Sequence, residues 1–503
     1  MLIKTDSDLI EPYLTDASNM SGGKADKVLI PETQAELREA VAHCAAEGTP
    51  ITVAGSGTGL TGARVPLGGV IISTERLNRI VSIDTVAKRG VVEPGVLLKD
   101  YQRAAEEVGL LYPPDPTERG CSMGGTVAAN SSGARTFKYG ATRAFVEGLR
   151  VVLSDGEELH LKRGEVIAGG ADGLDLVLHS TSGKRYALRL PDITMPNIKH
   201  AAGYFVKPNM DAIDLFIGSE GTLGVIAEIE TRLLDQPERI VAGVVFFDDM
   251  ERLLRFVEEA REESLRNNRA DSADSADSAD SKSAGISSRA LEFFDAQALN
   301  FVRDQYPNIP NDAAGAIWFE QEVSDETEEA LLMAWYELIG KHTPFMDESW
   351  FAITEKDQEH LREFRHAVPA KTYEIVRELK QQKIGTDMAV PDQQFRDLYD
   401  FYMREFATEQ LNYIVFGHIG NSHVHANIFA SSPDEYARAK AVYHRCVQKA
   451  LSLGGTISAE HGVGKIKREY LKTMYGERGI EQFRAVKAVL DPQGLLGVGT
   501  MFF

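Results

Sequence analysis

Cysteine is scarce in this sequence, with three residues among 503: Cys44, Cys121 and Cys446, none of them in a C-x-x-C pair. This spacing excludes a disulfide framework and a thiolate zinc site, and a reducing cytoplasm is the default compartment. Long apolar runs are also missing, because residues 1–6 (MLIKTD) start no signal peptide and no stretch of about 18 apolar residues follows. We expect neither export nor a transmembrane segment.

Basic residues are outnumbered, since 54 Lys and Arg against 75 Asp and Glu leave a formal net charge of −21. A surface of that sign argues against nucleic acid or an anionic membrane as a partner. A small anionic substrate would therefore need a local cationic pocket. With 43% hydrophobic and 26% charged residues, the chain is globular and long enough for two or three domains. Composition leaves the oligomeric state open.

Two short stretches concentrate side chains able to bind a metal or move a proton, although the chain has only 12 histidines. Residues 417–425 (GHIGNSHVH) predict a hairpin, because apolar strand patterns flank a turn at 420–422. On its returning strand, His423, His425 and Asn427 would share one face. The second stretch, 458–462 (SAEHG), adds Glu460 and His461.

These residue types suit a catalytic metal site. Imidazole and carboxylate bind Zn²⁺, Mn²⁺ or Fe²⁺, and three protein ligands with one open position are typical of catalysis. Glu460 is the obvious third ligand, and His461, followed by Gly462, could act as a base near neutral pH. The alternative is that these are ordinary histidines of strands and loops. That alternative explains any single histidine better than it explains the whole cluster.

An Ala-Asp-Ser repeat runs from Ala270 to Ser281, after a helical stretch that ends near Arg269. Such a tract buries nothing, so we expect a flexible surface loop at 270–283.

The N-terminal half is rich in glycine. A helix over residues 33–47 and a strand at 51–54 lead into a loop from Gly55 to Gly62, which contains G-x-G-x-x-G; Glu75 follows a second strand at 70–72. A Rossmann unit needs a helix directly after the glycines, but Pro66 and two glycines occupy that place. The Walker lysine is missing as well. What remains is a loop of backbone N–H groups and hydroxyls that could wrap a diphosphate.

Segments 112–117, 121–133 and 215–226 repeat this chemistry, each joining an apolar element to small residues that let backbone approach a ligand. Glycine loops are often plain turns. Several that carry hydroxyl or amide side chains are better explained by one large, phosphate-bearing cofactor.

The order of these motifs resembles the FAD-dependent D-2-hydroxyacid dehydrogenases, the D-lactate, D-2-hydroxyglutarate and glycolate-oxidising enzymes of the vanillyl-alcohol-oxidase-type flavoprotein superfamily. The resemblance runs from about Val28 to the C-terminus. It is carried by 53–62, 92–95, 114–117, 121–125, 138–140, 218–224, both histidine stretches and 491–492.

The resemblance implies an α+β fold with a two-part PCMH-type FAD-binding domain, a substrate (cap) domain built on an antiparallel sheet, and a C-terminal segment that returns to the flavin. The corresponding limits are an N-terminal segment 1–27, an FAD-binding domain 28–236, a cap domain 237–450 and a C-terminal segment 451–503.

The resemblance also implies the cofactor residues. They are Gly55, Ser56, Gly57, Thr58, Gly59 and Thr61 at the pyrophosphate, with Pro114, Asp115, Ser122, Gly124, Gly125, Asn130, Gly133, Glu220 and Ile226 lining the FAD. Thr58 stands in the area where members of the superfamily often carry a histidine bonded to the flavin, so we expect FAD to be bound without a covalent link there.

By the same resemblance, His418, His425 and Glu460 match the metal ligands (Zn²⁺, or Mn²⁺ or Fe²⁺) and His461 matches the base. A cation would polarise the C2 hydroxyl of the substrate, His461 would accept its proton, and the hydride would pass to flavin N5. Arg365 matches the arginine that grips the substrate carboxylate, with a solvated helix arginine as the alternative. Asn427 joins the substrate residues.

Two departures from the family pattern stand out. Asn421, Ser422 and His423 replace the usual Asp-Gly-Asn, so a carboxylate is lost and an imidazole gained. His423 could be a fourth ligand, a substrate contact or neither. Near residues 385–391, the lysine that some members use for a distal carboxylate has no counterpart, with Lys380 and Lys383 only nearby. This favours D-lactate or glycolate over 2-hydroxyglutarate.

Two other functions fit the motifs: a flavin-dependent lyase similar to alkyl-glycerone-phosphate synthase, and a non-catalytic flavin-binding subunit of an oxidase complex. For a dehydrogenase, the electron acceptor would be a quinone, a cytochrome or an electron-transfer flavoprotein. The acceptor could hold an otherwise cytoplasmic protein at the membrane periphery.

Overall fold

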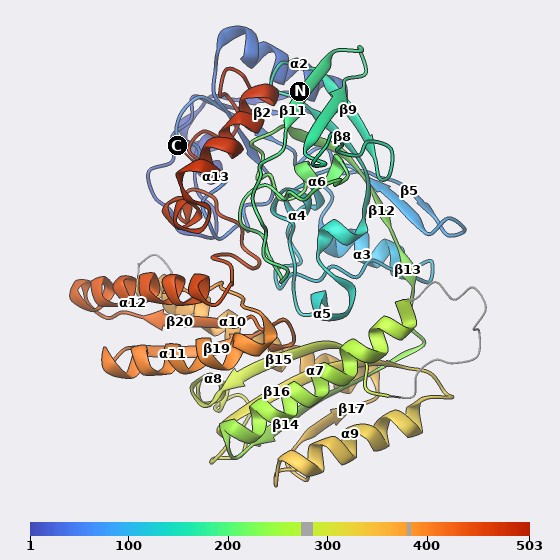
Figure 1. Ribbon diagram of the computed structural model, residues 1–503, viewed down its shortest axis with the longest axis vertical. Helices are drawn as coiled ribbons and strands as arrows, with labels where there is room; N and C mark the ends of the chain where they lie inside the picture. The colour runs from blue at the N-terminus through green and yellow to red at the C-terminus, as the bar shows by residue number, and fades with distance from the viewer. Residues whose placement is uncertain (273–284, 380–383, 503) are drawn as a thin grey trace. The chain divides into compact units, whose positions relative to one another are not determined.

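The computed structural model describes residues 1–502 except 273–284 and 380–383 (Figure 1). The chain forms two compact units. The first contains residues 1–132, 141–236 and 456–503, and the second contains 133–140 and 237–455. The C-terminal segment therefore belongs to the same unit as the glycine-rich N-terminal half. The domain limits given above stay a proposal.

The first sheet of unit 1 has the order β1 (Leu2–Lys4), β2 (Lys27–Ile30), β4 (Val70–Ser73), β3 (Ile51–Ala54), with β4 parallel to β2 and β3. Helix α2 (Gln34–Glu47) connects β2 to β3. Thr33 caps its start and Gly48, at φ +65°, ends it. The predicted helix and strands are confirmed, and β3 reaches β4 without a helix, as the rejection of a Rossmann unit predicted.

The second sheet of unit 1 is antiparallel, in the order β5 (Ile80–Asp84), β6 (Arg89–Val92), β12 (Val225–Arg232), β8 (Val146–Val152), β9 (Glu158–Lys162). Leu37 and Val41 of α2 share a core with Val152 and Val225 of this sheet and with Leu496 from the C-terminal segment. Apolar burial thus joins both sheets and the chain end.

The remaining elements of unit 1 are α1 (Ser7–Ile10), η1 (Glu11–Tyr13), α3 (Leu98–Glu106), β7 (Leu110–Leu111), α4 (Met123–Ala129), η2 (Thr142–Phe145), β10 (Asp175–His179), β11 (Arg185–Arg189), α6 (Ile213–Phe216), β13 (Leu234–Asp235) and α13 (Arg468–Leu490).

Cys44, Cys121 and Cys446 are buried free thiols.

Unit 2 is built on a seven-stranded antiparallel sheet: β17 (Trp350–Ala352), β14 (Arg239–Phe247), β16 (Gly315–Val323), β15 (Ser288–Asp295), β19 (Asn412–Gly417), β20 (His425–Phe429), β18 (Ile384–Gly385). Its other elements are α5 (Thr136–Tyr139), α7 (Met250–Ser272), α8 (Ala296–Val302), α9 (Glu328–His342), α10 (Glu355–Leu379), η3 (Asp392–Gln394), α11 (Phe395–Thr408), η4 (Ile419–Asn421) and α12 (Pro433–Ser452).

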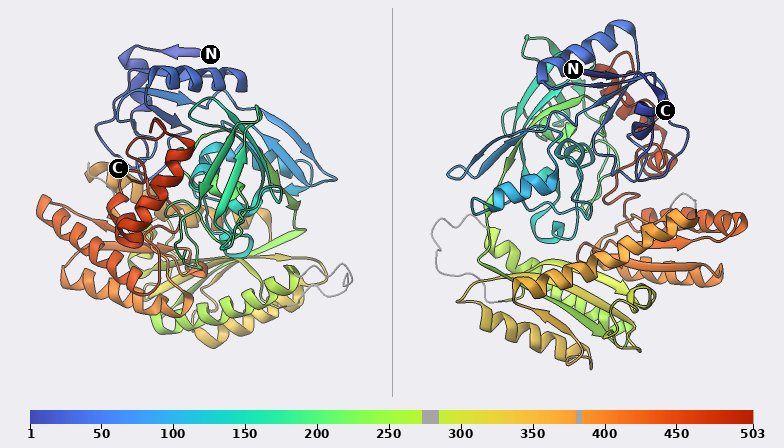
Figure 2. Two further views of the ribbon diagram at one scale, coloured as in Figure 1. Left: turned by 45° about the horizontal axis from the view of Figure 1, so that its top comes forward. Right: turned by 180° about the vertical axis from the view of Figure 1, so that it is seen from behind.

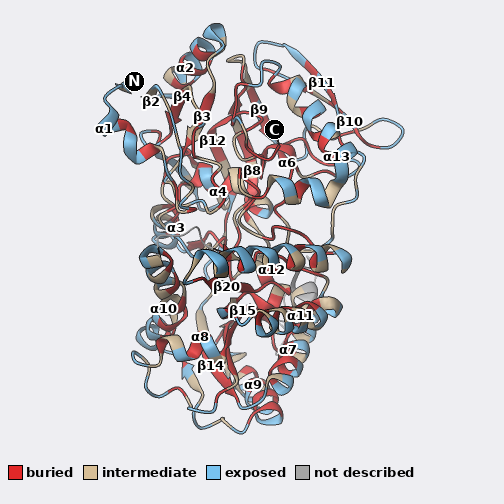
Figure 3. Ribbon diagram, turned by 90° about the vertical axis from the view of Figure 1, so that its left-hand side faces the viewer, coloured by how far each residue is buried: buried red, intermediate tan, exposed pale blue. Residues whose placement is uncertain are grey.

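Alternating side chains on β16 give this sheet two covered faces. Trp318 belongs to a core with Phe364 of α10, whereas Phe319 stacks on Trp335 of α9 at 3.9 Å between ring centroids. The views from the front and from behind show α7 and α9 over one face and α10 over the other (Figures 1 and 2). Buried strands with helices exposed on their outer sides are visible in each unit (Figure 3).

The predicted Ala-Asp-Ser loop at 270–283 is corrected at its first residues, and the rest of it is not described by the structure. Helix α7 continues to Ser272, so the first Ala-Asp-Ser triplet is helical and not part of a loop. The rest of the predicted loop, together with Lys380 and Lys383, lies outside the described residues. None of the helices in the described part of the chain is both long enough and apolar enough to span a membrane.

Candidate active site

The predicted diphosphate loop links β3 to β4 in unit 1. In the described part of the chain, the backbone N–H groups of residues 56–60 donate no hydrogen bond to another protein group. Gly57 adopts φ +80°, and a Cβ atom at Gly55 would lie 2.5 Å from Ser122 Oγ at the start of α4. Only glycine permits this close approach. The loop offers a row of donors to an anion, so it fits the diphosphate of FAD.

The other predicted cofactor residues lie mostly in unit 1. The Ser122 hydroxyl accepts a hydrogen bond from Gly125 N at 3.3 Å, which caps α4. Asn130 ends that helix at φ +47°, and its side chain accepts from Arg143 N at 3.0 Å. Ile226 lies on β12, whereas Gly133 groups with unit 2. Contacts of these residues with FAD stay a prediction.

The loop that carries Glu460 and His461 packs against the glycine loop within unit 1. Thr61 Oγ1 donates to the His461 carbonyl at 3.2 Å, and Lys465 N donates to the Thr61 carbonyl at 2.9 Å. Gly464 adopts φ +53°, and a Cβ atom there would lie 2.1 Å from the Thr61 carbonyl oxygen. The predicted base and the predicted diphosphate loop, 400 residues apart in sequence, are thus neighbours in one unit.

Glu220 holds the same loop from another side. Its two carboxylate oxygens accept hydrogen bonds from Val463 N and Gly464 N, each at 2.7 Å. Desolvation raises the pKa of the Glu220 carboxyl to about 7, although the two N–H donors act in the opposite direction. Glu220 therefore fixes the backbone that follows His461, a role not evident from the sequence.

Lys199 and Ser132 are polar neighbours of Glu460 in its own unit. Lys199 Nζ lies 3.4 Å from Glu460 Oε1, and Ser132 Oγ lies at the same distance. The Lys199 side chain is only 2% exposed. Buried lysines are rare without a counter-charge, so Lys199 is a candidate site residue that the sequence did not indicate. It stands in no recognisable motif.

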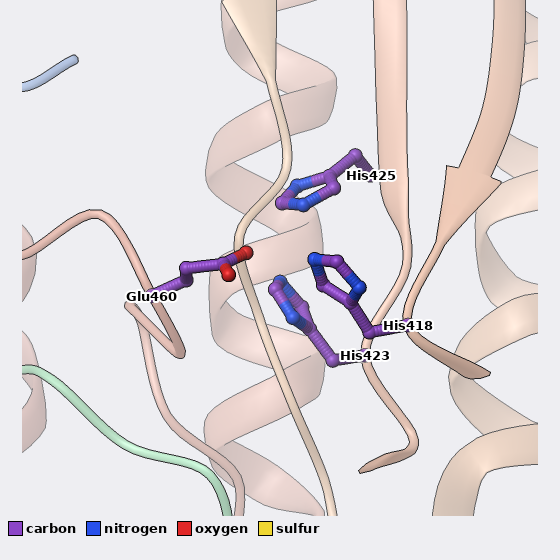
Figure 4. Close-up of side chains that lie close together, drawn as sticks. All are labelled: His418, His423, His425 and Glu460. Carbon is purple, nitrogen blue, oxygen red and sulfur yellow. The ribbon is translucent and has the colours of Figure 1, made fainter. Parts of the chain in front are cut away.

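The first histidine stretch forms the predicted hairpin in unit 2, with Phe416 of β19 paired to His425 of β20. His423 lies just before β20 and pairs with Ala389 in an isolated bridge. His418, His423 and His425, called here the three-histidine cluster, are buried, with ring centroids 4.5 to 5.6 Å apart. Figure 4 shows their rings grouped together.

Each ring of the cluster has one nitrogen close to an oxygen of the protein. His418 Nδ1 donates to Glu292 Oε1 at 2.7 Å, and His425 Nδ1 donates to the Thr386 carbonyl at 3.0 Å. Imidazoles that bind metals are usually oriented in this way through the second nitrogen. The predicted ligands His418 and His425 therefore fit a divalent cation. Glu292 and Thr386 were missed because neither stands near a histidine in the sequence.

Arg365 on α10 is buried and already paired. Its Nη2 lies 3.1 Å from Glu292 Oε2, its Nε donates to the same oxygen at 3.2 Å, and its guanidinium lies over the Trp318 ring. Arg365 thus reaches His418 through Glu292. Asn427 donates to the His425 carbonyl at 3.2 Å. Contact of Arg365 or Asn427 with substrate stays a prediction.

The predicted site residues therefore fall into two groups. Glu460 and His461 belong to unit 1, and His418, His425, Arg365 and Asn427 belong to unit 2. That Glu460 and the two histidines share one ion stays a prediction.

Comparison with known families gives two matches. A model described as "FAD linked oxidases, C-terminal domain" matches residues 236–501, and one described as "FAD binding domain" matches residues 25–162.

Several characterised proteins resemble the chain along nearly its whole length. The glycolate oxidase subunit GlcD of Bacillus subtilis is 29% identical, covering 97% of this chain and 92% of that protein. A D-2-hydroxyglutarate dehydrogenase of Xanthomonas citri is 28% identical, over 99% and 94%. A D-lactate dehydrogenase of Anaerostipes hadrus is 26% identical, over 98% and 93%.

Solved structures agree on the fold. Substrate-bound p-cresol methylhydroxylase matches with a TM-score of 0.70 at 14% identity, over 99% of this chain and 93% of that one. An alkyldihydroxyacetonephosphate synthase matches with a TM-score of 0.66 at 15% identity, over 98% and 81%. The predicted α+β architecture with a PCMH-type FAD-binding fold is confirmed.

Proposed function

This chain belongs to the family of FAD-linked oxidases, and from that premise we propose that it oxidises a D-2-hydroxyacid to the 2-oxoacid with non-covalently bound FAD and a divalent metal ion. The named relatives act on glycolate, D-lactate and D-2-hydroxyglutarate. The observation that carries the proposal is the hydrogen bonding between the His461 loop and Thr61 of the glycine loop.

His461 is proposed as the base. Thr61 binds the carbonyl of His461 and Glu220 binds the backbone that follows it, so the imidazole is presented from a hydrogen-bonded loop next to the proposed diphosphate site. A positioned histidine can take the proton of a substrate hydroxyl near neutral pH. FAD, held by residues 55–61 and the loop at 121–133, supplies the acceptor for the hydride from C2.

The metal is proposed to bind His418 and His425, with Glu460 as the third ligand. A Zn²⁺, Mn²⁺ or Fe²⁺ ion held there would polarise the C2 hydroxyl and lower its pKa. Glu292 and the Thr386 carbonyl hold the two imidazoles in one tautomer and one orientation. Arg365 and Asn427 are the proposed substrate contacts.

D-lactate or glycolate is the favoured substrate, because the lysine that some family members use for a second carboxylate has no clear counterpart near residues 385–391, with Lys380 and Lys383 only nearby. The electron acceptor is proposed to be a quinone, a cytochrome or an electron-transfer flavoprotein.

Anaerobic flavin bleaching tests cofactor, reaction and substrate together. FAD-loaded, metal-supplemented protein is mixed with glycolate, the two enantiomers of lactate and the two enantiomers of 2-hydroxyglutarate. We expect the flavin band to bleach with D-lactate or glycolate and to persist with L-lactate. A flavin that stays oxidised across the panel would contradict the proposal and favour a lyase or a non-catalytic flavin-binding subunit.

A further inference from the structure

The proposed function assigns His418 and His425 to the metal but gives no role to His423, the third member of the three-histidine cluster. It is fully buried, and its ring centroid lies 4.5 Å from that of His425 and 5.5 Å from that of His418. One ring nitrogen from each of the three histidines lies within 4.8 Å of the other two. Three imidazoles this close fit around a single cation.

The backbone directs the His423 ring toward the other two. Ser422 adopts φ +52°, a left-handed conformation that reverses the chain just before His423. The Ser422 hydroxyl donates to Asp392 Oδ1 at 2.6 Å, and His423 pairs with Ala389 in an isolated antiparallel bridge. A non-glycine residue in this conformation persists only where its surroundings fix it. The orientation of His423 is therefore built into the hairpin.

A buried carboxylate, Asp387, lies next to the His423 ring, as Glu292 lies next to the His418 ring. His423 Nε2 lies 3.1 Å from Asp387 Oδ1, and both side chains are fully buried. His418 has Glu292 and His425 has the Thr386 carbonyl in the same position. His418 and His425 thus have a hydrogen-bonded oxygen at one nitrogen, and His423 has a carboxylate oxygen at ion-pair distance from one nitrogen. Oxygen partners in this position orient histidine ligands. Asp387 also supplies negative charge that a bound cation needs nearby.

We propose that His423 is a third imidazole ligand of the divalent metal, through Nδ1, and that Asp387 is its positioning residue. This inference rests on the proposed function, which assigns His418 and His425 to the metal. Three nitrogen ligands from one unit favour Zn²⁺, Co²⁺ or Fe²⁺ over Mn²⁺ and Mg²⁺, because imidazole suits the first group and oxygen ligands suit the second. His423 thereby compensates for the carboxylate that Asn421 replaces in the usual family pattern.

Cobalt binding tests the proposal without a measurement of turnover. The full-length, FAD-loaded protein is freed of metal with a chelator and titrated with Co²⁺ against a competing chelator, and X-ray absorption counts the imidazoles on the ion. We expect three imidazoles in the wild type. His423→Asn, which restores the usual family residue, should leave two imidazoles and weaken Co²⁺ binding by at least about tenfold.

Two further variants sharpen the result. Asp387→Asn should keep three imidazoles and weaken binding by about tenfold, because it disturbs only the orientation of the ring. His444→Asn, on the exposed side of α12, is the matched control and should bind Co²⁺ as the wild type does.

The outcomes separate this inference from the proposed function. Unchanged affinity and spectrum in His423→Asn, or two imidazoles in the wild type, would overturn the role of His423 alone. The wild-type count decides the question even if the variant does not fold. Failure of the wild type to bind Co²⁺ would overturn both. Three imidazoles in a protein whose flavin no hydroxyacid bleaches would support His423 and refute the proposed reaction.

Discussion

At the scale of single residues, Glu292 joins two side chains to which the family resemblance gives separate tasks. It accepts from His418 Nδ1 through one oxygen and pairs with Arg365 through the other. All three side chains are buried. The carboxylate therefore balances the buried guanidinium and fixes the imidazole at the same time, and removal of either Glu292 or Arg365 leaves a buried charge without its counterpart.

A double-mutant cycle measures this coupling. Glu292→Gln and Arg365→Met should each lower the free energy of unfolding by about 3 kcal/mol, because each strands one buried charge. The double variant should lose clearly less than the sum, since it buries neither charge. Chemical denaturation of the four proteins gives the coupling energy. Additive losses would show that the interaction between Glu292 and Arg365 contributes nothing to the free energy of unfolding.

His461 gives the residue-scale prediction for the reaction. His461→Gln should slow anaerobic flavin reduction by about 10² or more, because a positioned base is removed. FAD content should stay at the wild-type level, since the bond from Thr61 goes to the backbone carbonyl of residue 461 and survives the change. His43→Gln, on the exposed face of α2, is the control. Equal rates in both variants would exclude His461 as the base.

At the scale of elements, the loop from residue 458 to 464 has its shape imposed by two partners. Thr61 and Glu220 hold its backbone, and Gly462 and Gly464 take the left-handed conformations that the path requires. The same loop carries both Glu460 and His461, so a change in its path alters both side chains together.

Two glycine substitutions separate conformational cost from close packing. Gly48→Ala, at φ +65° with open space around it, should cost about 1 kcal/mol for the backbone conformation. Gly464→Ala should cost more, because its Cβ atom would lie 2.1 Å from the Thr61 carbonyl oxygen. FAD retention after gel filtration should fall in Gly464→Ala alone. Equal losses of FAD in both variants would argue against the packing of this loop on the glycine loop.

Glu220 makes the stability of this element depend on pH. Because the pKa of Glu220 is raised to about 7, the folded protein keeps a proton that an unfolded chain releases near pH 4.5. The resulting stabilisation is complete below about pH 4.5 and is lost as the pH rises through 7. Glu220→Gln lacks this titration, so its stability relative to the wild type should rise between pH 5 and 8, by at most about 3 kcal/mol. A difference independent of pH would contradict the raised pKa.

At the scale of the whole molecule, the formal charge of −21 governs encounters more than fold. A cationic redox partner should be attracted over a distance of about 10 Å at 0.1 M salt, and a neutral one should not. The charge therefore bears on which electron acceptor the protein meets quickly, without identifying that acceptor.

Salt dependence makes this testable once a substrate is known. Reduction of a cationic acceptor such as cytochrome c should slow by about tenfold between 10 mM and 300 mM salt, because screening weakens the attraction. Reduction of a neutral short-chain quinone measured in parallel should change little. The same salt dependence for both acceptors would rule out steering by net charge.

The local elements and the chemical class could be predicted from the order of residues alone. Helix α2, strands β3 and β4 and the β19–β20 hairpin follow from apolar periodicity, caps and turn residues, which act between near neighbours along the chain. The glycine and histidine motifs indicated the flavoprotein family for the same reason, since their residues are contiguous.

The side chains that support the site could be identified only once the chain was folded. Thr61 meets the His461 carbonyl across 400 residues, Glu292 meets His418 across 126, and Asp387 lies beside His423. A single glutamate, aspartate or lysine in a sequence forms no pattern that predicts which distant residue it will contact. Their roles arise when burial forces each charge to find a counterpart, which happens only after the sheets and helices have packed.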